Sequence, residues 1–288
     1  MRRLLPVSLL CLAAGALNAC QPEEVILTEN IPTAGVRFIH AVPDTGAMDF
    51  RPVDIVENSQ FYGVAFRPTN AAFYKNARAG SRHYRIFMSA DLSLPSAQQQ
   101  AQASTVVKDT TFTLEAGHNY TFILWGYARA GSPLGPAMKL DIIDDNPGDP
   151  GASVALRIVN TAGLGAIDGK QYPAAGAPPA AATWANVAPQ SASAYISATP
   201  ASIRYNVTPA GGGAALFADP TALAGVAATV DIEAQPGTTI AGSAVSGFVF
   251  PRSVAGSKAP QGTISGINYG LPGIMFVWDR RPPRAPGL

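Results

Sequence analysis

The side chains of this sequence that can do acid–base or ligand chemistry are few. It contains three histidines, His40, His83 and His118. His40 stands near Arg37 and Asp49 in the sequence. An imidazole, a guanidinium and a carboxylate in one loop-built site would suit a hydrolase or a metal-dependent enzyme. These three residues therefore define the catalytic alternative for this protein.

An internal comparison argues against catalysis by His40. Residues 36–41 (VRFIHA) parallel residues 156–161 (LRIVNT), and Asn160 stands where the first segment has His40. An amide can make the hydrogen bonds of a histidine, but it takes up no proton at neutral pH. We therefore expect both side chains to hydrogen-bond to strand or turn backbone.

The other shared residues have structural interpretations as well. Arg37 and Arg157 match, and an alternate strand position suits a cross-strand salt bridge to a carboxylate, with the stem packed on the sheet. Asp49 and Asp168 also match, and a carboxylate soon after a turn can accept backbone amide hydrogen bonds. We assign no catalytic residue, no metal ligand and no cofactor, and predict that the protein is not an enzyme.

The parallels continue along the chain at a spacing near 120 residues. Tyr84-Arg85-Ile86 resembles Tyr205-Asn206-Val207, and residues 142–147 resemble residues 277–282. This period is too long for a solenoid repeat. The turn-rich segment 146–151 marks a boundary, because neither a helix nor a strand tolerates its prolines and glycines. The sequence predicts a duplicated domain, with copies at 34–148 and 152–282 and a tail at 283–288.

Both copies show the alternation of β-strands. Apolar and polar residues alternate over 111–114, residues 120–125 form a β-branched and aromatic run, and 28 glycines and 25 prolines punctuate the chain. We predict two tandem Ig-like Greek-key β-sandwiches. Tyr120 fits a tyrosine corner, for which copy two offers Ile240. The low-complexity segment 95–103 reads as a solvated loop.

The chain opens like an export signal. A positive n-region precedes an apolar run over residues 4–16, which is shorter than the ~20 residues of a spanning helix. The following tetrapeptide, Leu17-Asn18-Ala19-Cys20, resembles the lipobox of bacterial lipoproteins. The resemblance implies a signal peptide at 1–19 and attachment of a diacylglyceryl group to Cys20.

This resemblance also implies a location. Residues 20–33 would form a tether, and Gln21, in place of the aspartate that retains lipoproteins at the inner membrane, implies the outer membrane. Cys11 is lost with the signal, so no intrachain disulfide is possible. Two arginines are lost too, which leaves 18 basic and 19 acidic side chains. This balance provides no basic field for nucleic acid.

A second alternative concerns the boundary between the copies. Residues 141–149 (DIIDDNPGD) are rich in the oxygen ligands that calcium prefers. The spacing differs from an EF-hand loop, and copy two has Arg280 and Arg281 in this region. A charged, proline-terminated linker is the simpler interpretation. A calcium-rigidified surface adhesin remains the alternative.

The first copy resembles a known family. The segments VRFIHAVPD (36–44), GAMD (46–49) and LEAGHNYT (114–121) are similar to the opening strand and hairpin of DUF4397 domains. The similarity covers residues 34–145 and is diluted over 152–280. The resemblance implies a β-sandwich fold and a location in the cell envelope, and it assigns no catalytic residue to this sequence. We therefore expect a lipid-anchored envelope protein that binds or scaffolds an envelope protein or a polysaccharide.

Overall fold

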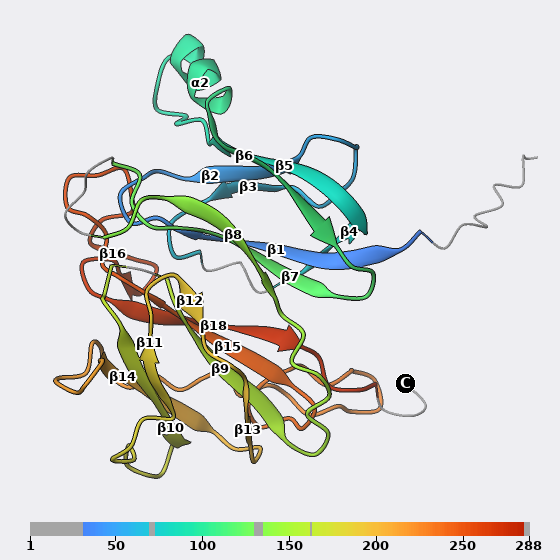
Figure 1. The fold of residues 1–288 in the computed structure, drawn as a ribbon, viewed down its shortest axis with the longest axis vertical. Coiled ribbons are helices and arrows are strands. Elements are labelled where there is room, and N and C mark those ends of the chain that lie inside the picture. Colours follow the sequence, from blue (N-terminus) through green and yellow to red (C-terminus); the bar gives the residue numbers. More distant parts are fainter. Residues whose placement is uncertain (1–30, 69–72, 130–134, 162, 285–288) are drawn as a thin grey trace, which may run out of the picture. The chain divides into compact units, whose positions relative to one another are not determined.

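The computed structural model describes residues 31–68, 73–129, 135–161 and 163–284. These residues are nearly all β, which confirms the predicted fold class. We call β1–β8 the N-terminal strand set and β9–β18 the C-terminal strand set (Figure 1). The first set contains β1 (Thr33–Ala41), β2 (Met48–Pro52), β3 (Phe61–Val64), β4 (Lys75–Arg78), β5 (Gly80–Met88), β6 (Val106–Leu114), β7 (Asn119–Trp125) and β8 (Lys139–Asp144). The second contains β9 (Val154–Asn160), β10 (Ile167–Pro173), β11 (Trp184–Val187), β12 (Ser191–Ala192), β13 (Ile196–Ala198), β14 (Ile203–Pro209), β15 (Ala244–Phe250), β16 (Thr263–Ile264), β17 (Ile267–Asn268) and β18 (Gly273–Arg280).

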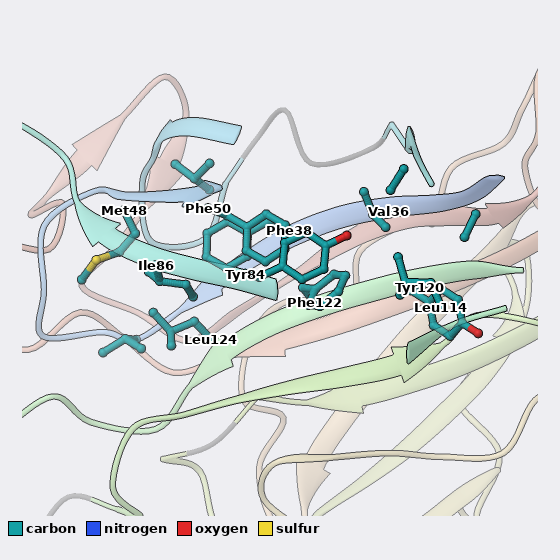
Figure 2. Packing of buried hydrophobic residues seen from close by; sticks show 14 residues of the cluster. Val36, Phe38, Met48, Phe50, Tyr84, Ile86, Leu114, Tyr120, Phe122 and Leu124 are labelled. Atoms are coloured by element: carbon teal, nitrogen blue, oxygen red, sulfur yellow. The ribbon is translucent and has the colours of Figure 1, made fainter. Parts of the chain in front are cut away.

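The N-terminal strand set is a sandwich of two sheets, with strand orders β4-β1-β7-β8 and β3-β2-β5-β6. Its core is aromatic (Figure 2). Phe50 of β2 stacks on Phe38 of β1, with ring centroids 5.1 Å apart, and on Tyr84 of β5 at 4.8 Å. Alternation along β1 directs Phe38 into this core and its neighbours to the opposite face.

The C-terminal strand set has the same two-layer plan. One sheet has the order β12-β9-β15-β18, with β13 also paired to β9, and the other has the order β11-β10-β14. Their shared core includes Leu156 of β9 and Tyr205 of β14, and Trp184 stacks on Tyr205 at 5.4 Å. Tyr84 and Tyr205, which match in the sequence, are thus both core residues.

A third apolar cluster lies between the two strand sets. It joins the sheet of β1 and β7 to the sheet of β9 and β15, and we call these two the central sheets. Ile39 and Trp125 contribute from the first central sheet, and Val159 and Phe248 from the second. The central sheets are therefore covered on both faces, and every residue of β9 and β15 is buried.

Each central sheet is built around a parallel pair of strands. β1 pairs with β7, and β9 pairs with β15. We call the end at which these four strands begin the proximal end, and the other the distal end. The strand orders differ from the ABED and CFG sheets of immunoglobulin constant domains. The sandwich is thus confirmed, whereas Ig-like Greek-key connectivity is not.

Segment 95–103, expected to be a loop, instead contains helix α2 (Ser96–Ala103). Its alanines and glutamines are good helix formers, and Pro95 occupies the N-cap position. Sequence periodicity missed it because the helix has no buried residue and hence no apolar stripe. Within the described residues, no helix has the length and apolarity needed to cross a bilayer. Cys20 and the predicted signal peptide lie outside the described residues.

Candidate functional site

Four charged side chains meet between the central sheets. Arg37 lies on β1 and Arg157 on β9, while Asp145 follows β8 and Asp279 belongs to β18. All four side chains are buried, with at most 3% of the side-chain surface exposed. We call this cluster the Arg–Asp quartet.

Arg37 uses all three of its nitrogens. Nε donates to Thr121 Oγ1 at 2.6 Å and Nη1 to the Trp278 carbonyl at 2.8 Å. Nη2 donates to Asp279 Oδ1 at 2.5 Å and to Asp145 Oδ2 at 3.3 Å. Arg37 therefore binds one carboxylate from its own strand set and one from the other.

Arg157 repeats this pattern from the opposite side. Its Nε donates to Ser246 Oγ at 2.6 Å, and its Nη2 bonds to Asp145 and lies 3.8 Å from Asp279 Oδ1. Thr121 donates its hydroxyl hydrogen to Asp145, and Ser246 donates its own to Asp279. Each arginine is thus paired with a neighbouring hydroxyl, which in turn holds a carboxylate.

Two tyrosines complete the arrangement. The hydroxyl of Tyr74 donates to Asp145 Oδ2 at 2.8 Å, and that of Tyr195 to Asp279 Oδ2, also at 2.8 Å. The guanidinium carbon of Arg37 lies 4.6 Å from the Tyr74 ring centroid, and that of Arg157 lies 4.5 Å from the Tyr195 ring centroid. These distances are within the range of cation–π attraction.

Burial and charge pairing compete in the quartet. Burial alone would lower the pKa of Arg37, but Tyr74 and the two aspartates together raise it above its ordinary value. Against the effect of burial, the two aspartates and Tyr195 raise the pKa of Arg157. Burial raises the pKa of Asp145, and the two arginines oppose that shift. With two charges of each sign, the cluster can be buried as a neutral network.

His40 and Asn160 bond to corresponding turns. His40 Nε2 lies 3.0 Å from the Gly46 carbonyl, and Asn160 Nδ2 donates to the Gly165 carbonyl at 2.8 Å. The backbone N–H of Val42 donates to His40 Nδ1 at 3.3 Å, which leaves the hydrogen on Nε2. Burial lowers the pKa of His40 to about 4. The buried imidazole is therefore neutral at physiological pH.

Asp49 and Asp168 fasten the next strand in each set. Asp49 accepts the backbone N–H of Gly63 on β3 at 2.8 Å, and Asp168 accepts that of Asn186 on β11 at 2.7 Å. Gly63 and Asn186 both have left-handed backbone, with φ of 62° and 52°. Asp49 also pairs with Arg51. The aspartates therefore hold the left-handed backbone of a neighbouring strand in place, rather than a turn close by in the sequence.

The three residues of the catalytic alternative do not form one site. Arg37 bonds between the central sheets, His40 bonds to the turn after β1, and Asp49 bonds within the sheet of order β3-β2-β5-β6. They share no hydrogen-bond partner. The surface hollows beside Tyr127, Ser89 and Phe73 are lined by none of the three.

The tyrosine corner is present in the N-terminal strand set. Tyr120 accepts the backbone N–H of Glu115 at its hydroxyl, at 3.1 Å. Tyr120 pairs with Val36 on β1, and Val245 holds the matching position opposite Leu156 on β9. The sequence comparison had placed Ile240 there. The difference arises because the segment before β15 is longer than the one before β7.

The carboxylates of segment 141–149 point to separate partners. Asp141 pairs with Lys139, Asp144 with His118, and Asp149 with Arg280, while Asp145 belongs to the quartet. Alternation along β8 sets Asp141 and Asp144 on opposite faces, and Asp145 and Asp149 follow the end of that strand. Among the residues that the structure describes, no group of three or more His, Cys, Asp or Glu side chains is placed to hold a metal ion.

Sequence reasoning found the two arginines and missed their partners. The comparison of residues 142–147 with 277–282 aligned Asp144 with Asp279, whereas strand pairing makes Asp145 the counterpart of Asp279. Thr121 pairs with Ile143, and Ser246 with Val277. In the structure, residue 143 therefore corresponds to residue 277, whereas the sequence comparison matched residue 142 with residue 277. The aspartates that recur in these two segments were the sequence feature that could have revealed the quartet.

Comparison with known proteins identifies one domain. Residues 34–169 match the family described as Domain of unknown function (DUF4397). The match begins in β1, runs past the turn-rich segment 146–151, and ends within β10. No curated protein matches the chain.

Proposed function

We propose that this protein is a lipid-anchored protein of the cell envelope with a non-catalytic role in binding or scaffolding. The observation that carries the non-catalytic part is the burial and mutual pairing of the Arg–Asp quartet. Its arginines and aspartates form hydrogen bonds with one another and with Thr121, Ser246 and two tyrosines. Charges held in this way join two bodies and are not available to a substrate.

We further infer that the two strand sets are duplicated copies of one β-sandwich. In both, the arginine pairs across a parallel ladder with a hydroxyl residue: Arg37 with Thr121, and Arg157 with Ser246. In both, that hydroxyl donates to an aspartate after or within the last strand. Chance does not readily produce the same four-part arrangement twice. The inference agrees with the sequence spacing near 120 residues.

The quartet also suggests what the duplication achieves. Two sandwiches joined by buried ion pairs and an apolar cluster cannot swing freely, so surfaces on the two copies keep a fixed relation. Two fixed surfaces on one body favour bivalent contact. The partner we propose is an envelope protein or a polysaccharide, met at the outer membrane where the Cys20 lipid would hold the chain.

The anchor is tested by exchanging Cys20 for serine. Cells producing either form are fed an alkyne-labelled fatty acid and then fractionated. We expect the native chain to carry label and to sediment with outer membranes, and Cys20→Ser to lose the label and become soluble. A Gln21→Asp control keeps the label and moves the protein to the inner membrane. A Cys20→Ser form that sediments like the native chain would overturn the proposal.

The binding role is tested by crosslinking in intact cells, followed by purification under denaturing conditions. We expect a discrete crosslinked protein or glycan that is absent from cells producing the soluble Cys20→Ser form. If no discrete product forms, the binding role is wrong.

A further inference from the structure

An exposed hairpin projects from the proximal end of the C-terminal strand set. Val226 and Gln235 exchange two backbone hydrogen bonds of 3.1 and 2.9 Å, and the Thr229 N–H donates to the Ile232 carbonyl at 2.9 Å. We call residues 226–235 the proximal hairpin. The Ala201 N–H donates to the Thr238 carbonyl just after the hairpin. Ala201 follows β13, whose Ala198 pairs with Val154 at the start of β9, so the hairpin lies near that end of β9.

The proximal hairpin exposes apolar side chains that the fold does not use. Val230 is 86% exposed, Ile232 56% and Val226 52%. Val230 and Asp231 form the tip of this hairpin, between Thr229 and Ile232. The acidic Glu233 is paired with Arg284. Exposed apolar residues that lie together can form a surface that meets another apolar phase.

A groove beside the hairpin has the composition of a membrane interface. It has a volume of about 570 Å³ and is lined by Ile232, Trp278 and Arg281, among others. The Arg281 guanidinium lies 4.9 Å from the Trp278 ring centroid. Tryptophan and arginine are the side chains that favour the boundary between lipid headgroups and acyl chains.

The length of the chain between Cys20 and β1 limits how far the hairpin can lie from a lipid attached to Cys20. β1 begins at Thr33, at the proximal end, where Asn119 at the start of β7 donates to the Asp279 carbonyl near the end of β18 (Figure 1). The hairpin lies at this end too, because Ile232 lines one groove with Trp278 of β18. Eleven residues follow Cys20 up to Ile31, and they span at most ~40 Å. A lipid on Cys20 would therefore keep the proximal end within reach of its bilayer.

We propose that the proximal hairpin docks on the bilayer that holds the lipid anchor, with Val230 and Ile232 entering the acyl boundary and Trp278 at headgroup level. This inference rests on the proposed lipid attachment. The anchor makes even a weak apolar contact effective, because docking becomes intramolecular. Docking fixes the orientation of the body, with its distal end directed away from the membrane.

The test uses matched cysteine variants at opposite ends of the molecule. Val230→Cys is compared with Leu92→Cys, whose native side chain is 82% exposed in the loop after the distal end of β5. A second pair is Ile232→Cys and Leu271→Cys, at 56% and 57% exposure. Each acylated full-length variant is labelled with a fluorophore and reconstituted in phosphatidylethanolamine–phosphatidylglycerol vesicles carrying nitroxide on the acyl chains.

We expect several-fold stronger quenching at positions 230 and 232 than at positions 92 and 271. Equal quenching at the two ends would refute docking. Burial of the position 230 label that grows with protein concentration in the absence of vesicles would assign the hairpin to a second copy of the chain instead, and would equally overturn the proposal.

A parallel arm separates this inference from the anchor itself. The Cys20→Ser chain receives an N-terminal hexahistidine and is captured on nickel-chelating lipid, which supplies the tether without acylation. Quenching at position 230 in this arm, together with an unacylated native chain in cells, would leave docking standing and remove the proposed anchor. Acylation in cells without quenching in either arm would leave the proposed anchor standing and would refute docking.

Discussion

Replacing Asp145 with asparagine removes one of the two negative charges of the Arg–Asp quartet and leaves its volume unchanged. In the native protein Asp145 pairs with Arg37 and Arg157 and accepts hydrogen bonds from Thr121 and Tyr74. Asparagine retains one acceptor oxygen, but the cluster then carries a net positive charge inside the protein. The two arginines keep their charge, because a guanidinium does not deprotonate in proteins.

The magnitude follows from the complete burial of these groups. Removing one partner of a buried ion pair costs about 3–5 kcal/mol, because the remaining charge is left uncompensated. Asp145 and Arg37 have no exposed side-chain surface, so no reduction for solvent screening applies. For a body of this size we expect Tm to fall by about 6–20 °C. The loss should be largest in the contact between the two strand sets, which the quartet joins.

The assay is urea unfolding followed by tryptophan fluorescence, because Trp125 lies in the cluster between the central sheets. Asp144→Asn is the matched control. Asp144 is the adjacent carboxylate, it is 47% exposed, and its pairing with His118 is worth about 1 kcal/mol or less. Adding Arg157→Gln to Asp145→Asn removes the unbalanced charge and should recover part of the loss. If Asp145→Asn costs no more than Asp144→Asn, the buried network does not hold the two sets together.

Two further predictions concern the turns. Burial lowers the pKa of His40 from 6.5 to about 4, so the unfolded chain binds more protons, and stability should fall by roughly 3 kcal/mol as the pH drops from 6.5 to 4. His40→Asn, which copies Asn160, should flatten urea midpoints over this range, and an unchanged slope would contradict the assignment. Tyr120→Phe leaves the Glu115 N–H without its partner and should cost about 1 kcal/mol. Tyr62→Phe, at an exposed position, should be neutral in the same urea titration, and equal effects of the two changes would argue against the corner.

Local patterns predicted much of what each strand does. Alternation in residues 36–41 separated Phe38, which enters the aromatic core, from Arg37 and Ile39, which face the other way. The exchange of His40 for Asn160 pointed to a hydrogen bond with turn backbone, and both side chains make one. These inferences succeed because strand periodicity and side-chain chemistry act over a few residues.

Such patterns could not predict the register between strands or the contacts between residues that are far apart in the sequence. The aspartates of residues 142–147 and 277–282 aligned one residue out of step, because the pairing of β15 with β18 shifts between Ala244 and Val245. Helix α2 was missed because it packs no side chain against the core.

By itself, the sequence determined the all-β class and the faces of the strands, since alternation is a local feature; the export signal with its cysteine stays a prediction. Only the tertiary structure decided that the second face of each central sheet is covered by the other, so that Arg37 meets Asp279 more than two hundred residues away. The physical reason is that alternation assigns a side chain to a face, and which surface covers that face depends on how the sheets pack. The quartet exists only where the two sheets meet, because four charges can leave water only when each finds its opposite.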